Sequence, residues 1–554
     1  MSTAAAEVQE AATFDRQSVA ILALVSVAQL ILVTGATIVN VALPSIETAL
    51  HFSRVDLQWV INAYTLIFAG FLLLGGRAAD LLGRRSVLMA GLSLFTGASL
   101  ICGLAQSSIV LEVARGVQGL GAAIISPAAL SILLVTFREG AARNRALAVW
   151  GGVAGGGQAL GLILGGLLTQ GPGWRWVFFV NVPIGILAVL AAPRILPESH
   201  GEDRSRSYDL PGAITVTLAL VLLVYAIVGT TTYGRGATRT IGELIGAALL
   251  LAVFVAIEGR IAAHPLVPLR IFRSQTLSGA NVVMLLLGLA LFAAYYFLSL
   301  YMQQVQGFSP LRTGLGFLPI SVGFVVVASV AARLVGRVGA KWLLVIGMSI
   351  TAAAFLLLAQ LPDQGTYARD ILPAFIVLPL GAALAILSVT NAAVAGVTPR
   401  DAGLASALVN TSQLTGGAVG LGLLATIAAS RTSSVLATDP RAGLAHALVQ
   451  GFHSAFFVAA GIAAAGAIVA LLTIPAAIGR VTRARRLTPL ISHPAEESTP
   501  PAEHGTARPL GGLAACALCD PVSRHPVVSA SGGHVGQVAR PIESSIHGQS
   551  AHSQ

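Results

Sequence analysis

Fourteen long apolar stretches dominate the sequence, and each is about as long as the roughly 20 residues that a helix needs to cross a bilayer. Lipid offers the backbone no hydrogen-bond partners, so apolar stretches of this kind span it as helices. A large soluble helical protein would need polar helix faces, which these stretches lack. We therefore predict an all-α polytopic membrane protein with spans at 19–43, 57–77, 87–104, 109–136, 146–169, 176–195, 211–230, 241–258, 277–303, 313–333, 342–361, 371–394, 403–429 and 451–478.

The composition agrees with lipid as the main solvent. Only 10% of the residues are charged, whereas a soluble domain carries about a quarter. The net charge of +10 would suggest nucleic acid in a soluble protein, but the arginines lie in short connections between apolar stretches. The N-terminus has no basic region before its first apolar stretch, so we interpret that stretch as a retained helix rather than a signal peptide. The composition thus predicts a lipid bilayer as partner, and no nucleic acid.

Basic residues gather in alternate connections. Arg77, Arg84 and Arg85 follow the second span, and a further group at 480–486 follows the last one. By the positive-inside rule, this pattern places both termini in the cytosol and requires an even number of spans. We therefore predict a multi-pass protein of the cell (inner) membrane.

A weak repeat relates the two ends of the chain. The pair at 52–53 returns at 308–309, and Arg77 and Gly83 correspond to Arg333 and Gly339 at the same places relative to the helices. Parallel repeats of this kind build transporters whose substrate site lies between two halves. We predict a cytoplasmic N-terminus (1–18), two six-helix bundles (19–195 and 277–478), two inserted helices (211–258) and a disordered cytoplasmic tail (480–554). The tail holds Cys516 and Cys519, which form too weak a pattern to predict a metal or redox site.

The connection after the second span contains a cluster of small and charged residues, namely Gly76, Asp80, Gly83, Arg84 and Arg85. Small residues allow a tight turn, and an aspartate there is placed to pair with a basic group or a helix N-terminus. We predict a conformational latch, closed in one state of the protein and broken in the other. The alternative is an ordinary basic loop on the cytosolic side.

Two features inside the apolar stretches require an explanation. Arg115 lies at bilayer depth, where a charge costs about 2.5–3.5 kcal/mol on insertion scales, and Glu112 lies three residues earlier on the same helix face. Arg115 has either a functional role or a static role in joining helices. The second feature is a stripe of glycines, which is not a phosphate loop because it lacks G-K-[ST] and a flanking strand. The stripe consists of Gly157, Gly161, Gly165 and Gly166.

These motifs resemble those of the major facilitator superfamily, and in particular its fourteen-helix drug:proton antiporter family (the EmrB/QacA subfamily). The spacing from Gly76 to Arg85 is similar to the signature loop, and the surroundings of Arg115 resemble a motif whose arginine is implicated in proton transfer. The glycine stripe resembles the antiporter motif, except that Leu162 replaces its proline. Further resemblance lies at 37–44, 57–64, 174–185, 265–269, 301–310 and 402–410, so that it covers residues 20–480.

The resemblance implies a major facilitator fold and proton-driven export of drugs or hydrophobic metabolites by alternating access. The sequence has no nucleotide-binding motif, so we predict the proton gradient as energy source, with no cofactor and no metal. We also predict that the transporter is not an enzyme and is a monomer. The resemblance implies a role for Arg115 in proton transfer, and we predict that proton coupling runs through Glu112 with Arg115. We expect polar side chains at bilayer depth to line the substrate cavity, although most membrane amides simply bond neighbouring helices. The candidates are Gln29, Asn40, Asn62, Tyr64, Gln118, Asn281, Asn391 and Asn410.

One departure bears on the substrate. Many family members have an aspartate where this chain has Gly35, and the acidic residues nearest to membrane depth are Glu112, Asp56 and Glu258. A permanent cation at the midplane would need a carboxylate partner, so we predict small organic substrates that are neutral or weakly acidic, such as polyketide-like antibiotics. An uptake permease is an alternative, because the fold does not specify direction. A membrane sensor or enzyme is a remote one, since it would need convergent catalytic side chains or a folded extramembrane domain.

Overall fold

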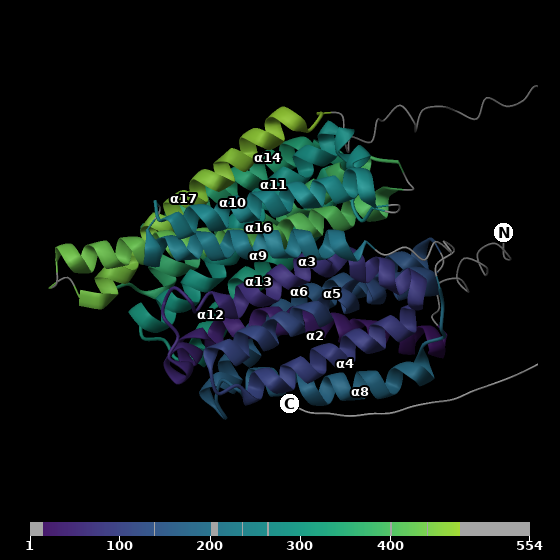
Figure 1. The fold of residues 1–554 in the computed structure, drawn as a ribbon, viewed down its shortest axis with the longest axis horizontal. Helices are drawn as coiled ribbons and strands as arrows, with labels where there is room; N and C mark the ends of the chain where they lie inside the picture. Colours follow the sequence, from purple (N-terminus) through teal and green to yellow (C-terminus); the bar gives the residue numbers. More distant parts are fainter. Residues whose placement is uncertain are drawn as a thin grey trace, which may run out of the picture. The chain divides into compact units, whose positions relative to one another are not determined.

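The computed structural model describes residues 15–137, 139–200, 209–234, 236–262, 265–398, 401–439, 441 and 443–476. Within this part of the chain, 14 helices are long and apolar enough to cross a membrane, as predicted (Figure 1). The predictions for the first 14 residues and for the tail at 480–554, including Cys516 and Cys519, lie outside the described residues.

The first eight spans consist of ten helical elements, and a 3₁₀ turn follows them. They are α2 (Arg16–Leu50), α3 (Trp59–Leu82), α4 (Arg84–Leu104), α5 (Ser108–Thr136), α6 (Ala141–Gln170), α7 (Trp176–Phe179) with α8 (Asn181–Ile195), α9 (Leu210–Tyr233), α10 (Thr238–Ala256) with the π-helix η1 (Ile257–Ile261), and the 3₁₀ turn η2 (Leu269–Arg273).

The last six spans are likewise built from α-helices, some of them joined to a short second helix. They are α11 (Gln275–Leu300) with the π-helix η3 (Tyr301–Val305), α12 (Pro310–Gly316) with α13 (Leu318–Val338), α14 (Ala340–Leu358), the π-helix η4 (Tyr367–Ile371) with α15 (Leu372–Ala395), α16 (Ala402–Thr438), and α17 (Gly443–Thr473).

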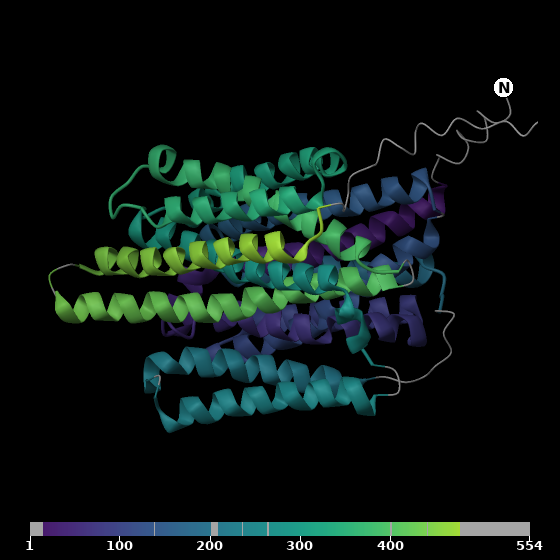
Figure 2. The ribbon, with the colours of Figure 1, turned by 90° about the horizontal axis from the view of Figure 1, so that it is seen from above.

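The predicted boundaries of the last two spans are wrong, and the first span continues past its predicted end at 43 to Leu50. The span predicted at 403–429 continues as α16 to Thr438, and the span predicted at 451–478 begins at Gly443 and ends at Thr473. Hydropathy falls after Ala429 because polar residues follow, but Ser, Thr, Ala and Arg continue the helix until Asp439, just before a proline in the sequence. The resulting α16–α17 hairpin extends on the left of Figure 2 beyond the other helices.

The connections lie at two ends of the helix bundle. At one end Arg85 contacts Glu198, and Ser274 donates to the Gly396 carbonyl. We call this the inner end, because the arginine pattern predicts that it faces the cytosol. At the other end, the outer end, Arg175 donates to the Ala105 carbonyl. The repeat is visible in the backbone too, because Gly83 and Gly339 both turn the chain with positive φ, 100° and 91°.

A large apolar cluster joins the two halves toward the outer end, and a small one joins Leu66 of α3 to Ala418 of α16 through α9, nearer the middle of the helices. We call α2–α8 the N-half and α11–α17 the C-half; most of the N-half lies in the lower part of Figure 1 and most of the C-half in the upper part, with α12 and α13 drawn beside α6. The large cluster joins C-half residues such as Phe297 to the outer parts of the N-half, for example Val41 and Phe178. A further cluster, around Phe95 and Leu133, consists of N-half residues alone and occupies its inner part.

The hairpin of α9 and α10 lies beside both halves, at the lower edge of Figure 2. Thr217 of α9 packs against Gly70 of the N-half, and Val224 packs against Gly422 of the C-half. The outer helix of the hairpin, α10, is largely exposed, and only Thr240 and Ala247 are buried along it. Helix α9 therefore contacts the two halves together, whereas α10 presents an apolar surface suited to lipid.

Candidate functional site

Arg115 is the centre of a buried polar cluster in the N-half. Its side chain is 0% exposed, its Nε donates to the Val60 carbonyl at 2.8 Å, and its Nη1 donates to the Gly35 carbonyl at 3.4 Å. The guanidinium lies 4.4 Å from the centre of the Tyr64 ring. An arginine suits this position because its planar group donates in several directions and stacks on an aromatic face. Arg115 thus joins α5 to α2 and α3.

Gln118 extends this cluster to a fourth helix. Its Oε1 accepts from Arg115 Nη1, and its Nε2 donates to Ser99 Oγ of α4 at 2.6 Å. The remaining guanidinium nitrogen, Nη2, has no partner among the described residues. A buried donor without a partner is costly, so Nη2 is the atom of this cluster best placed to receive a further acceptor.

Glu112 does not pair with Arg115 in this structure. It lines a cavity of about 450 Å³ at the outer end, together with Asp56, His51, Trp59 and other residues. Of the three acidic residues noted from the sequence, Glu112 and Asp56 are therefore neighbours, while Glu258 lies at the inner end of the inserted hairpin. The cavity beside the outer part of α5 therefore contains two carboxyl groups.

The glycine stripe is a packing face. A Cβ on Gly161 would overlap Thr37 Oγ1, and a Cβ on Gly165 would lie 2.5 Å from the Ile38 carbonyl oxygen. Gly157 likewise faces Leu30 and Val33. Because real Cβ atoms do not approach so closely, only glycine allows α6 to contact α2 along this line.

Gly166 and Leu162 face the other half instead. A Cβ on Gly166 would lie 2.6 Å from the Pro310 carbonyl oxygen, and a Cβ on Gly314 would overlap the Leu162 carbonyl oxygen. The residue that replaces the motif's proline therefore sits, fully buried, where α6 meets α12.

Polar bonds also join the halves at the outer end. Ser299 Oγ donates to the Asn40 carbonyl at 2.7 Å, Gln303 Nε2 donates to the Val41 carbonyl at 3.0 Å, and Gln304 Nε2 donates to a Glu47 carboxylate oxygen at 2.7 Å. We call these residues the outer gate. Glu47 also borders a cavity of about 120 Å³ between the halves.

Glu47 and the gate residues of the C-half were not predicted from the sequence. Glu47 lies within the first helix, beyond the predicted end of that span at 43. The run Tyr301-Met-Gln-Gln304 belonged to the family resemblance, but nothing in it showed that Gln304 reaches the other half. Nearer the middle of the helices, Gln158 Nε2 donates to the Tyr295 hydroxyl at 2.6 Å, which is a further unpredicted bond across the halves.

The predicted cavity residues of the N-half are buried. Asn62 is 0% exposed, and neither its Nδ2 nor its Oδ1 has a described partner. Its Nδ2 would lie 3.9 Å from a Cβ on Gly422, which places Asn62 where α3 meets α16 of the other half. Gln29 and Tyr64 also keep a buried oxygen without a partner among the described residues. Asn40 donates to the Ala36 and Thr37 carbonyls of its own helix.

The predicted cavity residues of the C-half divide in two. Asn281 donates to Leu277 of its own helix and accepts from Ser412 Oγ at 2.8 Å, so it joins α11 to α16 within one half. Asn391 and Asn410 are exposed near the inner ends of α15 and α16. The structure thus brings Tyr64 and Gln118 to Arg115, and leaves the C-half amides apart from them.

The inner end shows no corresponding closure between α6 and the C-half among the described residues. Gly155 still faces Val325 of α13, since a Cβ on this glycine would lie 3.1 Å from Val325 Cγ2. One turn further in, Gly151 and Gly152 are exposed, and no described atom lies within 4 Å of a Cβ placed on either. The described halves therefore pack on each other at the outer end, whereas α6 has no such contact at Gly151 and Gly152 near the inner end.

The residues of the predicted latch contact their own half. Arg84 and Asp80 form an ion pair of 3.1 Å, in which Asp80 remains 45% exposed. Gly83 turns with φ of 100°, and a Cβ there would lie 2.5 Å from Glu198 Oε1. Gly76 has only Pro127 nearby, at 3.5 Å from a Cβ position. In this conformation Asp80 therefore has room for another partner.

Glu198, which no sequence pattern indicated, binds Arg85 and Ser86 at the end of this loop. Its carboxylate accepts from the Arg85 backbone N–H at 3.1 Å and from Ser86 Oγ at 2.6 Å, and lies 3.4 Å from Arg85 Nε. Partial burial works in the opposite direction, but these hydrogen bonds and the Arg85 charge hold the pKa of Glu198 below its usual range. The carboxylate is thus ionised when it anchors the loop after α3 to the segment after α8.

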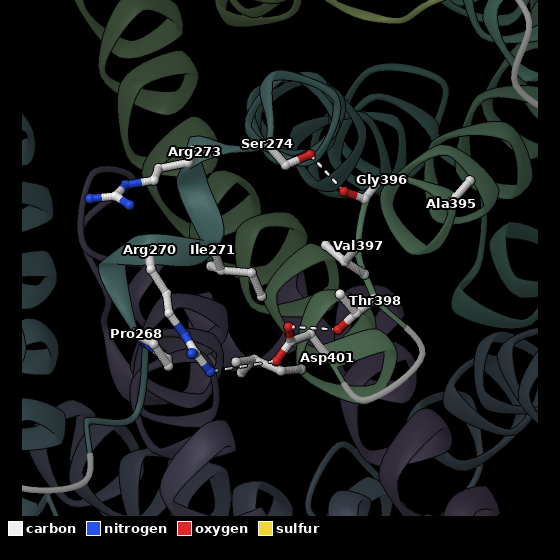
Figure 3. Close-up of a pocket in the computed structure, with 11 residues that line it drawn as sticks. Pro268, Arg270, Ile271, Arg273, Ser274, Ala395, Gly396, Val397, Thr398 and Asp401 are labelled. Carbon is white, nitrogen blue, oxygen red and sulfur yellow. Dashed lines mark hydrogen bonds and ion pairs between the residues drawn. The ribbon is translucent and has the colours of Figure 1, made fainter.

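A cavity of about 480 Å³ lies at the inner end of the C-half, between η2 and the connection from α15 to α16 (Figure 3). Arg270 reaches across it toward Asp401, with a closest distance of 4.0 Å, and Ser274 Oγ donates to the Gly396 carbonyl at 2.8 Å. Asp401 also accepts from Thr398 Oγ1. These contacts fasten the segment after the inserted hairpin to the C-half.

The described residues contain no group of three or more His, Cys, Asp or Glu side chains placed to hold a metal ion. The polar groups that the fold does bring together are an arginine cluster inside one half and hydrogen bonds between two halves that meet at one end. Such an arrangement is typical of a two-bundle membrane transporter.

The chain belongs to the major facilitator superfamily, whose family model matches residues 25–421 and again residues 321–506. This is a family of transporters, not enzymes, and its members generally need no cofactor. The chain is 38% identical over 459 residues to the puromycin resistance protein of Streptomyces alboniger, covering 82% of this chain and 90% of that one. It is 41% identical over 415 residues to the cephamycin export protein of Amycolatopsis lactamdurans, covering 74% and 85%. These matches are consistent with the fourteen-helix drug:proton antiporter family that the motifs resemble.

Solved structures share the fold. The POT family transporter PepTSo superposes with a TM-score of 0.61 at 16% identity, covering 83% of this chain and 98% of that one. A bacterial homologue of the human lysosomal transporter Spinster gives 0.59 at 16% identity, with the same coverage. The predicted major facilitator fold is therefore confirmed.

Proposed function

We propose that the chain exports antibiotics or other hydrophobic organic molecules across the cell membrane, driven by the proton gradient. The relatives carry names of antibiotic resistance and export proteins, over most of their own length. The observation that carries the mechanism is the divided core. The halves share buried apolar contacts at the outer end, and the inner part of the N-half has a core of its own. Two halves packed in this way are suited to rocking about a central site.

The direction of the opening follows from the predicted topology. With both termini in the cytosol, the inner end faces the cytosol and the structure is closed to the outside. In this conformation a substrate would enter from the cytosol or the inner leaflet. Breaking the outer gate, at Ser299, Gln303 and Gln304, would then release it outside. We propose this cycle for a monomer made of the bundles 19–195 and 277–478 with the inserted helices 211–258.

Proton coupling in this proposal uses Glu112 and Arg115. Arg115 is fixed by carbonyls of α2 and α3, so it keeps its charge and position while Glu112, in the outer cavity, exchanges protons with the outside. The cluster of Tyr64, Gln118 and the free Nη2 of Arg115 provides polar contacts for a neutral or weakly acidic substrate.

In a Glu112→Gln variant we expect drug-driven proton exchange to be lost, because an amide of the same shape cannot carry the proton. The measurement is proton release into a weakly buffered medium from proteoliposomes on addition of substrate. Glu139→Gln is the matched control, since Glu139 is 88% exposed in an ion pair with Arg143 at the inner end. Exchange retained in Glu112→Gln would remove Glu112 from the mechanism.

We also expect a neutral polyketide antibiotic to be exported better than ethidium. Gly35 leaves the first helix without a carboxylate near Arg115, and a permanent cation would meet a buried positive charge there. Efflux from cells with and without the gene measures both compounds. Faster export of ethidium would contradict the proposed substrate class and leave the transporter assignment intact.

A further inference from the structure

Two carboxyl groups meet at the inner base of the inserted hairpin. Asp209 precedes α9, and Glu258 lies in η1 at the end of α10. Both are nearly inaccessible, with 5% and 4% of their surface exposed. Neither residue belongs to the Arg115 cluster or to the outer gate. Acidic residues are rarely buried without a partner, so this pair requires an explanation of its own.

One oxygen of each carboxyl group is held by the backbone. Asp209 Oδ1 accepts from the Gly212 N–H at 2.8 Å, which caps the first turn of α9. Glu258 Oε2 accepts from the Val267 N–H at 3.0 Å, which fixes the segment that leads from the hairpin to the C-half. The backbone therefore orients both groups, and leaves one oxygen of each for something else.

The other oxygens, Asp209 Oδ2 and Glu258 Oε1, are buried and find no donor among the described residues. The π-helix η1 nevertheless packs against α9, and the Asp209 side chain is a neighbour of the Glu258 side chain. Two carboxylates cannot hydrogen-bond without a hydrogen, and two like charges in a buried site repel strongly. A single proton between the two free oxygens satisfies both of them at once.

Several charged groups of the neighbouring elements are paired with other residues. Within the described residues, ion pairs join Arg84 to Asp80, Arg85 to Glu198 and Arg270 to Asp401, and none of these pairs includes either carboxyl group. The other charged side chains on the packed elements are Arg77 on α3, Arg260 on η1 and Arg273 on η2. Arg260 is exposed, as is Arg273.

We propose that Asp209 and Glu258 share one proton and act as a proton-dependent clamp on the base of the inserted hairpin. With the proton bound, the pair carries one negative charge and holds the start of α9, the end of α10 and the backbone of Val267 together. Loss of the proton to water leaves two buried negative charges, which drives the carboxyl groups apart. Because α9 packs on both halves, through Thr217 and Val224, opening of the clamp changes how α9 contacts each half.

The clamp goes beyond export and does not depend on it, because it is tested by stability. We expect the unfolding temperature of the purified full-length protein in detergent to fall as the pH is raised from about 6 to 9. In Glu258→Gln the side-chain NH₂ donates a hydrogen bond to Asp209, so no shared proton is needed. The side-chain oxygen still accepts from the Val267 N–H. This variant is therefore expected to lose that part of the pH dependence which the clamp contributes, and to be more stable than the wild type at high pH.

Asp209→Asn repeats the test from the other side, since asparagine also caps helices well, and it serves if Glu258→Gln does not fold. Glu139→Gln is again the control and should follow the wild-type curve. Infrared spectra give a second readout, because the carbonyl band of a protonated carboxylic acid should disappear on raising the pH in the wild type and be absent for this site in Glu258→Gln. Both amide variants following the wild-type pH curve would overturn the proposal, and so would saturable stabilisation of the wild type by Na⁺, which would indicate a bound cation instead of a proton.

Discussion

Replacing Arg115 by leucine is expected to abolish export and to destabilise the N-half. The guanidinium donates to carbonyls of α2 and α3 and lies over the Tyr64 ring. A buried acceptor that loses its hydrogen-bond donor costs about 1–3 kcal/mol. Here the groups left behind are two carbonyl oxygens and Gln118 Oε1. Efflux from cells that overproduce the protein measures export, and the unfolding temperature in detergent measures stability.

Arg115→Lys separates charge from geometry. Lysine keeps a positive charge, but its ammonium cannot donate to two helices and stack on Tyr64 in the same way. We expect it to restore part of the stability and little of the transport. Arg175→Leu is the matched control, because Arg175 also donates to a carbonyl, that of Ala105 at 2.8 Å, and also lies over an aromatic ring, that of Trp174, but at the outer surface. Wild-type export by Arg115→Leu would show that the cluster is only a packing feature.

Linking the halves at the outer end is expected to stop transport completely and reversibly. The backbone N–H of Leu311 donates to Gln170 Oε1 at 3.2 Å, which places α12 of one half against the end of α6 of the other. In a variant with Cys102, Cys516 and Cys519 replaced, cysteines at 170 and 311 should be joined by a short bifunctional thiosulfonate reagent. Export should then fall to background, because the gate cannot open, and return on addition of a reductant.

The control pair joins residues of one half only. His446 and Asp363 are both in the C-half at the outer end, with their side chains 2.6 Å apart. Cysteines at 363 and 446, treated with the same reagent, should leave export unchanged. Full export by the protein linked at 170 and 311 would mean that the outer contacts stay closed throughout the cycle, which contradicts the role of the gate.

Hydropathy predicts most of this fold because lipid allows few alternatives. All 14 spans lie near their predicted places, and the error at α16 arises where the helix leaves the apolar region and continues with polar residues. Arg115 could be identified for the same reason, since a charge within an apolar stretch stands out. The glycine stripe was recognisable from its spacing, and its contacts with α2 explain the spacing.

Bonds between distant segments could not be predicted from one sequence. Asn281 and Asn62 have the same character in the sequence, yet Asn281 joins two helices of one half, and Asn62 lies beside the other half with no partner among the described residues. The role of Glu198 comes from its contacts with a loop more than a hundred residues earlier in the chain. Asp209 and Glu258 are separated by a whole helical hairpin, and only the fold brings their carboxyl groups together.

Inverted membrane vesicles test most directly whether a proton gradient drives substrate from the inner end to the outer end of this molecule. The vesicles are energised so that their interior becomes acidic, and uptake of a radiolabelled neutral polyketide antibiotic is followed. We expect accumulation inside the vesicles that a protonophore abolishes and that the Arg115→Leu variant lacks. Accumulation in right-side-out vesicles instead, or accumulation that persists with the protonophore, would contradict proton-driven export.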